Sequence, residues 1–369
     1  MPSLADIVGR FRRNPDAPLT ESDLATLAAD GQDDLWALKA LFFSTYRKGS
    51  FAESSRYALR ILELEPSDEN AVNAVVLQRE LGDREGGLLL LGKHRSIIEP
   101  IGYHDLANSL LAGLGRVSLA IAHGQKSLEL KDRPAAKREL PVLHRYSLND
   151  RSRNILSFSV WGGNPRYLQG AINNAIVARY LYPGWTCRFY TDDSTREDFR
   201  RALVSLGAQV ILPDLPADPF GLFWRFLVED DPDVDIYVVR DADAVVNVKE
   251  RVAVAQWLSS GYAFHVMRDH LQHCELMLAG MWGAHRGNIG QMRQKIESYV
   301  ASLPKRAGYR HKDQHFLRDI VWPIAKTSLI THDSYFNFMN PRRFDGNFML
   351  PSDMHVGQND FIRKKSQTR

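Results

Sequence analysis

Residues 234–243 constrain the fold of this chain more than any other segment, because an apolar, β-branched run ends there in two aspartates. The run reads Val-Asp-Ile-Tyr-Val-Val-Arg and is followed by Asp241, Ala242 and Asp243. A short run of this composition is typical of a buried strand in a parallel sheet. Open α/β sheets bind ligands at the carboxyl ends of their strands, which is where the two aspartates fall. The segment therefore predicts an α/β domain with a ligand site at Asp241 and Asp243.

Two carboxylates at such a position predict a metal site. Carboxylate oxygens are ligands that Mg²⁺ and Mn²⁺ prefer, and the bound cation can bridge the phosphate oxygens of a ligand. Asp-x-Asp is also common in surface loops, so a solvated turn is the alternative. The place of Asp241 and Asp243 after a hydrophobic strand favours a site for a metal and a diphosphate.

From Asn154 onward, expected strands alternate with expected amphipathic helices. The strands are 155–160, 186–190, 208–212, 235–239 and 262–267, and the helices are 168–180, 195–206, 221–228 and 249–258. This alternation favours a mostly parallel sheet that helices cover on both faces. We expect this α/β domain to span residues 154–365, after a charged, proline-containing linker at 135–153.

The first third of the chain has an internal period of 34 residues. Prolines mark it at Pro66, Pro100 and Pro134, and glycines recur between them at Gly49, Gly82 and Gly115. The period resembles that of the tetratricopeptide repeat, a helix–turn–helix unit that buries its apolar face by stacking on its neighbours. We therefore expect an all-α, tetratricopeptide-like solenoid over residues 1–134, with an irregular helical domain as the alternative.

Composition places few limits on the function. The net charge of +3 is too small to indicate a nucleic-acid partner, and 44% hydrophobic with 25% charged residues is ordinary for a globular protein. The two cysteines imply no disulfide framework, and no apolar run is long enough for a signal peptide or a transmembrane segment. We expect a cytoplasmic protein of bacterial type, with a peripheral place at the inner membrane surface as a variant of that location.

Several further segments are consistent with a ligand site at Asp241 and Asp243. An aromatic segment at 221–227 carries a single arginine, Arg225, and glycines surround a tryptophan at 280–283. Asp313-Gln314 opens an expected helix, and His355 lies near the C-terminus. Over residues 154–363 this set resembles the nucleotide-sugar-dependent glycosyltransferases of the A fold (GT-A). The resemblance implies a Rossmann-like domain, Mn²⁺ or Mg²⁺ on Asp241 and Asp243, and a UDP- or GDP-sugar as the donor.

The resemblance also implies roles for individual residues. His355 would complete the metal shell, although the fuller His-x-x-Gly-x-x-Lys pattern is absent. Asp313 and Gln314 would lie against the reacting sugar, and Asp269 is a further candidate for the catalytic base. The residues expected to contact the donor are Ser157, Phe158, Ser159, Trp161, Arg225, Arg240, Asp241, Gly280 and Trp282.

Most of these residues also have a structural interpretation. Asp269 could end a strand and cap the next turn, and Asp313 could be the N-cap of its helix. Arg240 could form an ion pair instead of contacting a phosphate. The aromatic residues of 223–226 could be core, and His270 and His273 could be metal ligands only if partners join them.

The sequence therefore predicts a metal-dependent glycosyltransferase that transfers a sugar to a glycan, a lipid-linked glycan or a protein. Its helical repeats would dock the acceptor or a protein partner. Two alternatives remain at this stage. One is a sugar nucleotidyltransferase, for which the first loop, 162–166, is a poor match. The other is a non-catalytic repeat scaffold with a relic nucleotide-sugar domain, which the intact Asp241 and Asp243 disfavour.

Overall fold

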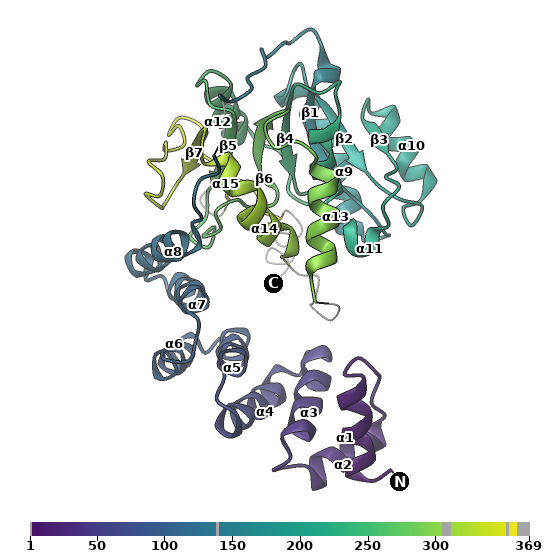
Figure 1. The fold of residues 1–369 in the computed structure, drawn as a ribbon, viewed down its shortest axis with the longest axis vertical. Coiled ribbons are helices and arrows are strands. Elements are labelled where there is room, and N and C mark those ends of the chain that lie inside the picture. Colours follow the sequence, from purple (N-terminus) through teal and green to yellow (C-terminus); the bar gives the residue numbers. More distant parts are fainter. Residues whose placement is uncertain (1, 138–139, 305–310, 352–353, 360–369) are drawn as a thin grey trace. The chain divides into compact units, whose positions relative to one another are not determined.

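The computed structural model describes residues 2–137, 140–304, 311–351 and 354–359 (Figure 1). The chain divides into two compact units, Met1–Leu130 and Lys131–Arg369, and each is described by itself. Residues 360–365, which the sequence assigns to the end of the α/β domain, lie outside the described part.

The first unit is built from helices alone within its described residues. Their bounds are α1 (Leu4–Arg13), α2 (Glu21–Asp30), α3 (Leu35–Arg47), α4 (Phe51–Leu64), α5 (Asp68–Glu80), α6 (Arg84–Lys93), α7 (Pro100–Gly113) and α8 (Val117–Lys131). Each helix from α3 to α7 packs on the next, and α5 also contacts α7. Stacked helices of this kind bury apolar faces that no single pair could cover.

Glycines with left-handed backbone lie in the turns of the paired helices. Gly49, Gly82 and Gly115, with φ of 74°, 82° and 70°, separate α3 from α4, α5 from α6, and α7 from α8. A left-handed residue just after a helix ends it and turns the chain, and glycine adopts that conformation without steric strain. The three turns occur where the 34-residue period predicts them, while the tetratricopeptide assignment stays a prediction.

The second unit contains a seven-stranded sheet in the order β3-β2-β1-β4-β6-β5-β7. The strands are β1 (Asn154–Ser159), β2 (Thr186–Tyr190), β3 (Gln209–Ile211), β4 (Ile236–Arg240), β5 (Phe264–Arg268), β6 (Met281–His285) and β7 (Leu329–Asp333). Strand β6 runs antiparallel to β4 and β5, and the other neighbours are parallel. The predicted class, an α/β domain with a mostly parallel sheet after an all-α region, is confirmed.

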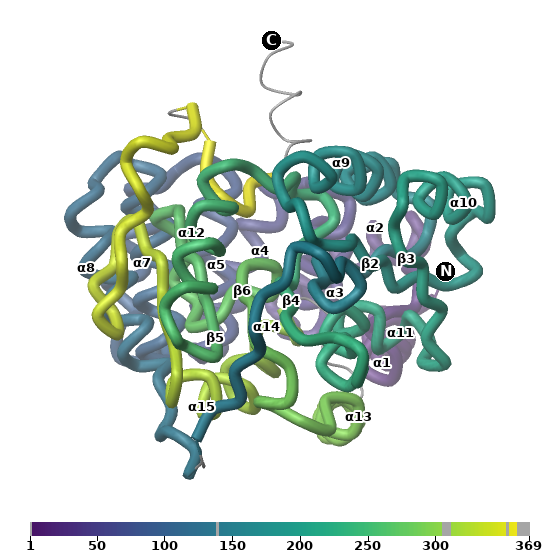
Figure 2. Tube along the Cα trace, turned by 90° about the horizontal axis from the view of Figure 1, so that it is seen from above, coloured from purple at the N-terminus to yellow at the C-terminus, as the bar shows by residue number. Residues whose placement is uncertain are grey.

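Helices cover both faces of the sheet. On one face, α9 (Pro165–Leu181), α10 (Glu197–Ser205) and α12 (Val248–Leu258) pack on alternate residues of β1, β2 and β4. The other face carries α13 (Met292–Ser302), α14 (Lys312–Phe316) and the segment η2 (Trp224–Asp230). Figure 2 shows α9 and α13 on opposite sides of the strands. The remaining short elements are η1 (Arg151–Arg153), α11 (Ala217–Phe220), η3 (Leu317–Val321) and α15 (Trp322–Ala325).

The segment expected as a helix at 221–228 is a 3₁₀ helix, η2, that begins later, at Trp224. Its backbone is tied to β1, because the N–H of Arg225 donates to the Ser159 hydroxyl at 2.9 Å. Phe223, Trp224 and Phe226 are at most 1% exposed, so the core interpretation of these aromatic residues is correct.

A search of the helices in the described residues finds none with both the length and the apolar character that a membrane span needs.

Two glycines of the first unit allow a paired test of the turn. Gly82 is left-handed, whereas Gly92 lies in the last turn of α6 with open space around its missing Cβ. Gly82→Ala should lower the free energy of unfolding by about 1 kcal/mol, because a Cβ is strained at positive φ. Gly92→Ala should raise it by about 0.5 kcal/mol, because alanine stabilises a helix relative to glycine. Urea unfolding of both variants checks the two signs, and equal effects would contradict the assigned turn.

Candidate functional site

Asp241 and Asp243 lie at the carboxyl end of β4 and line a cleft of about 890 Å³. An inner pocket of about 370 Å³ adjoins it and includes Ser159, Trp161 and Asp241 among its lining residues. These volumes fall in the range of small-molecule sites. The structure thus brings the two aspartates to the end of a central strand of the sheet and into a common cavity.

Helix α9 holds the loop that carries the aspartates. A Cβ on Gly170 would lie 2.8 Å from the Asp243 Cα, so only glycine lets the helix approach this closely. The buried Asn174, one turn further along α9, donates to the carbonyls of Ala242 and Ala244, each at 3.2 Å. Its side-chain oxygen accepts from Val246 N–H at 3.0 Å. A single side chain therefore satisfies three backbone groups of the loop.

Gly280 makes room for Asp241 from the opposite side. It immediately precedes β6, which pairs with β4, and a Cβ at this position would lie 2.7 Å from the Asp241 backbone nitrogen. The absence of a side chain at Gly280 therefore permits a close approach. The group that approaches is the aspartate itself.

Arg225 connects two carboxylates beneath the cleft. Its guanidinium pairs with Asp241 and with Asp313, the latter at 2.8 Å, and its side chain is only 6% exposed. Burial acts to lower the pKa of Arg225, but Asp241 and Asp313 outweigh it and raise that pKa. The guanidinium is therefore a fixed positive charge at the floor of the site.

Arg166 provides a second cation, paired with Asp243. Its Nε donates to the Asp243 carboxylate at 2.5 Å, and its side chain is 40% exposed on α9. Burial, reinforced by the nearby charge of Asp241, raises the pKa of Asp243. Protons therefore compete for Asp243 at a higher pH than for an ordinary aspartate.

Asp313 and Gln314 reach the same cleft from α14. The N-cap of this helix is His311, so Asp313 lies inside the first turn and the N-cap interpretation of Asp313 is wrong. Its Oδ1 accepts the Gln314 N–H at 2.9 Å, while its Oδ2 faces Arg225. Burial raises the pKa of Asp313, and the charge of Asp241 adds to that shift.

The end of β1 supplies one wall. Trp161 lines both cavities and meets Trp224 edge to face, with ring centroids 5.9 Å apart. Ser159 lines the inner pocket, whereas Ser157 is buried behind it and donates to the carbonyl of Arg225 at 2.7 Å. Of the expected donor contacts on β1 and after it, Ser159 and Trp161 face the cavities.

Three of the expected donor contacts lie in the core instead. Phe158 stacks on Phe189 at 4.8 Å on the α9 face of the sheet, and Trp282 packs against Phe226 on the other face. Arg240 is fully buried and pairs with Glu250 at 3.0 Å, so its salt-bridge interpretation is correct. The structure does not bring these three side chains to the cleft.

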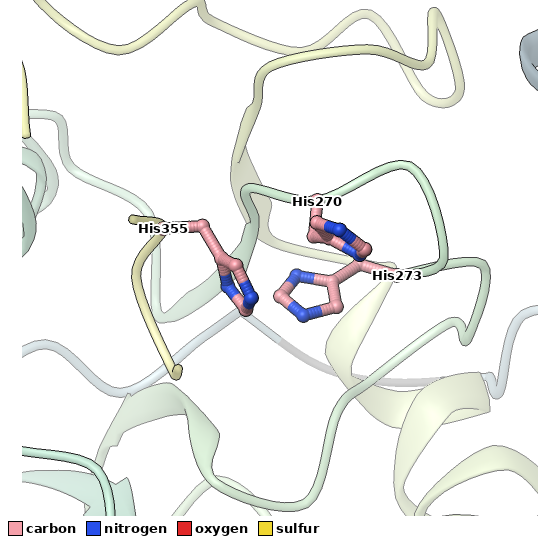
Figure 3. Close-up of side chains that lie close together, drawn as sticks. All are labelled: His270, His273 and His355. Carbon is pink, nitrogen blue, oxygen red and sulfur yellow. The ribbon is translucent and has the colours of Figure 1, made fainter. Parts of the chain in front are cut away.

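Asp269 and His355 form a separate group. The Asp269 carboxylate pairs with Lys249 at 2.6 Å and accepts the Val356 N–H at 2.8 Å. His355 lies with His270 and His273, as Figure 3 shows, and these three are the histidine group that the described residues offer to a metal. The structure therefore groups His355 with other histidines instead of with Asp241 and Asp243.

Three residues that hold or line the site were missed by the sequence reasoning: Arg166, Gly170 and Asn174. Gly170 and Asn174 are four residues apart, so they share one face of α9. That face also carries Ala171, Ala175 and Ala178, all buried. An asparagine on an otherwise small, apolar helix face was a usable signal, because such a side chain needs partners once it is buried.

The donor set at the acidic pair suits a hard cation. Two carboxylates open into one cleft, and oxygen ligands are what Mg²⁺ and Mn²⁺ take in proteins. Each carboxylate is paired with an arginine, so a cation competes with Arg225 and Arg166 for the same oxygens. The residues present therefore fit the metal that the resemblance implies.

The support of the loop can be tested at Asn174. Asn174→Ala should lower the free energy of unfolding by about 2–4 kcal/mol, because it leaves buried carbonyls and an N–H without partners. The neighbouring Asn173 is half-buried and accepts only from Gln169, at 3.0 Å, so Asn173→Ala should change stability by less than about 0.5 kcal/mol. Urea unfolding of the two variants measures both changes in the free energy of unfolding. Similar changes in the two variants would contradict the role given to Asn174.

The known proteins that this chain resembles come from solved structures alone. No protein-family model matches the sequence, and no curated protein matches it. Similar solved structures include a mutant O-GlcNAc transferase from Thermobaculum terrenum, at 16% identity and a TM-score of 0.39. That match covers 64% of this chain and 45% of the other, so this chain spans less than half of that protein.

Two further structures are also similar. One is glucosyl-3-phosphoglycerate synthase from M. tuberculosis, at 17% identity and a TM-score of 0.32, covering 52% of this chain and 76% of that one. The other is a mannosyltransferase from Pyrobaculum calidifontis in complex with GDP-Man and Mn²⁺, at 12% identity and a TM-score of 0.34, covering 64% and 67%. These three similar structures are thus glycosyltransferases. Because each TM-score is below 0.5, we derive the function of this chain from its own site.

Proposed function

We propose that this protein is a metal-dependent glycosyltransferase that transfers a sugar from a UDP- or GDP-sugar to a glycan, lipid-linked glycan or protein acceptor. One observation carries the proposal. Three carboxylates and two guanidinium groups meet at the carboxyl end of β4 in one cleft, namely Asp241, Asp243, Asp313, Arg166 and Arg225. The cleft lies where α/β sheets bind their ligands.

The charge balance of the cleft suits a cation together with an anionic ligand. At the end of β4, three carboxylates against two guanidinium groups leave one negative charge, which a divalent cation reverses locally; Asp192 and Asp218 are further carboxylates in the lining of the same cleft. The site then attracts a diphosphate, to which Arg166 and Arg225 can donate hydrogen bonds. Arg166 suits this role because its half-exposed side chain can leave Asp243, whereas Arg225 is buried and held by Asp313 as well.

The metal, when bound on Asp241 and Asp243, neutralises the charge that a leaving nucleoside diphosphate develops. Residues of the chain itself provide the other interactions with the donor. Trp161 and Tyr167 provide aromatic surface in the inner pocket, and Arg225 supports the floor. Asp313 and Gln314 present polar groups to the cleft near Asp241, where a reacting sugar would lie. The helical repeats of the first unit would dock the acceptor or a partner protein in a cytoplasmic setting.

The metal assignment is tested by neutralising each carboxylate. Asp241→Asn and Asp243→Asn should each remove the Mn²⁺-dependent part of UDP- or GDP-sugar binding, measured by calorimetry with and without Mn²⁺. The metal-free fold should not lose stability in Asp243→Asn, because its raised pKa means that ionisation at neutral pH already opposes folding.

Asp193→Asn is the matched control, since Asp193 follows β2 in the same domain, its side chain is 89% exposed, and it pairs with Arg200. It should bind nucleotide-sugar and Mn²⁺ as the parent does. Unchanged nucleotide affinity and metal dependence in both Asp241→Asn and Asp243→Asn would remove the basis for the proposal and favour the non-catalytic scaffold.

The role of Asp313 is tested by separating turnover from binding. Asp313→Asn should abolish release of nucleoside diphosphate from the donor while donor affinity stays within a few-fold, because the loss falls on the transition state. Asp319→Asn is the control, since Asp319 belongs to the following segment and pairs with Arg318 at 2.9 Å. Full turnover in Asp313→Asn would leave Asp313 as a structural partner of Arg225.

A further inference from the structure

Three histidines from two distant segments of the sequence meet outside the cleft. His270 and His273 lie in the loop after β5, and His355 lies in the C-terminal segment (Figure 3). Their ring centroids are 4.5–5.6 Å apart, and one nitrogen from each ring lies within 4.8 Å of the others. Such convergence of three imidazoles is what a metal centre requires.

We propose that His270, His273 and His355 form a Zn²⁺ site that is separate from the acidic pair. Imidazole nitrogen favours Zn²⁺ and related transition metals, whereas carboxylates suit Mg²⁺ and Mn²⁺. Three protein ligands leave a fourth tetrahedral position for water. The chemistry of the two donor sets thus separates two metals in one domain, and this inference stands independently of the proposed sugar transfer.

Two of the three rings, His270 and His273, are held in the neutral form. Burial lowers the pKa of His270 to about 4 and lowers that of His273 well below its ordinary value, with the neighbouring histidines adding to both shifts. Neutral imidazole is the form that binds metals, so these two rings do not have to lose a second proton at physiological pH.

Asp269 positions the two parts of the site. Its backbone N–H donates to His273 Nδ1 at 3.0 Å, and its carboxylate accepts the backbone N–H of Val356, the residue after His355. Lys249 and Ser334 hold the same carboxylate from the other side. Through its carboxylate, Asp269 is therefore a positioning residue for the segment that carries His355, which is a different role from the catalytic one that the sequence predicts.

Metal binding requires a small adjustment of this loop. Zn–N bonds of about 2.0–2.1 Å bring tetrahedral ligand atoms to about 3.4 Å from one another, which is closer than 4.8 Å. His355 Nδ1 lies 3.0 Å from a carbonyl, so it carries the proton and leaves Nε2 free for a metal. The Nδ1 atoms of His270 and His273 accept backbone N–H groups instead, so in the metal-free form Nε2 carries the proton of each ring. Ligation through Nε2 transfers that proton to Nδ1 by a change of tautomer and opens those two contacts.

A metal here would fasten the C-terminal segment to the loop after β5. Gly357, with φ of +84°, lies against the Met281 side chain, where a Cβ would be 3.2 Å from its Cγ. Met281 follows Gly280, which packs on Asp241. The fastened segment therefore supports the strand that borders the acidic pair.

The test uses the full chain without an affinity tag, stripped with a chelator and titrated with Zn²⁺ by calorimetry. We expect one Zn²⁺ per chain and at least about tenfold weaker binding in His270→Ala, His273→Ala and His355→Ala, since even outer partners of a metal contribute tenfold or more. His94→Ala, at a half-buried histidine of α6 to α7, should bind Zn²⁺ as the parent does. Asp241→Asn should also keep its Zn²⁺ while losing Mn²⁺.

Zn²⁺ affinity that is unchanged in all three histidine variants, or lost in Asp241→Asn alone, would overturn the proposal. Should a histidine variant fail to fold, Co²⁺ titration of the unaltered protein gives the second measurement. Intense visible absorption is expected from four-coordinate Co²⁺ on nitrogen ligands. A weak octahedral spectrum would also overturn the site.

Discussion

The buried charge of Arg225 is the interaction on which the cleft depends. A guanidinium removed from water needs partners, because an unpaired buried ion is costly by several kcal/mol. Asp241 and Asp313 provide them, and the backbone of Arg225 is held by the hydroxyls of Ser157 and Ser159. One residue therefore ties the ends of β1 and β4 to η2 and α14. The position of each carboxylate follows from the need to satisfy this cation.

The same pairing shapes what the site can bind. Asp241 is 45% exposed and shares Arg225 with the buried Asp313, so Arg225 keeps a partner when a cation takes Asp241. Asp243 has the opposite arrangement, since the carboxylate is buried and its partner Arg166 is half-exposed. A cation at the pair would thus free Arg166 for an anionic ligand while leaving Arg225 in place. Because the two arginines differ in exposure, Arg225 is held in place whereas Arg166 can move.

The sequence predicted five of the seven strands, and β1, β2, β4 and β5 were predictable because each is a short run that is buried on both faces. Strand β3 is partly exposed, and β6 and β7 were not among the expected strands. The sequence predicted the acidic pair because the end of a buried strand is a known ligand position. The faces of the strands were not predictable: Phe158 and Trp282 were taken for donor contacts, but the pleat turns them into the core. Gly170 and Asn174 matter only because α9 packs on the loop after β4, which is a tertiary fact. The histidine group likewise joins His270 and His273 to His355, which lies 82 positions after His273, so no local pattern predicts the complete group.

Strands β4 and β5 share a local sequence pattern, but the aspartates that follow them have different environments. Both end in Arg-Asp, as Arg240-Asp241 and Arg268-Asp269, and in both the arginine is fully buried. The arginines pair inward, with Glu250 and Asp333 respectively, so each following aspartate points past the strand end. Asp241 remains 45% exposed in a cleft, whereas Asp269 is 2% exposed because Lys249 and the segment after His355 cover it. The same Arg-Asp pair therefore ends in an exposed carboxylate after β4 and in a buried, ion-paired carboxylate after β5. The difference comes from the elements that pack over the end of each strand.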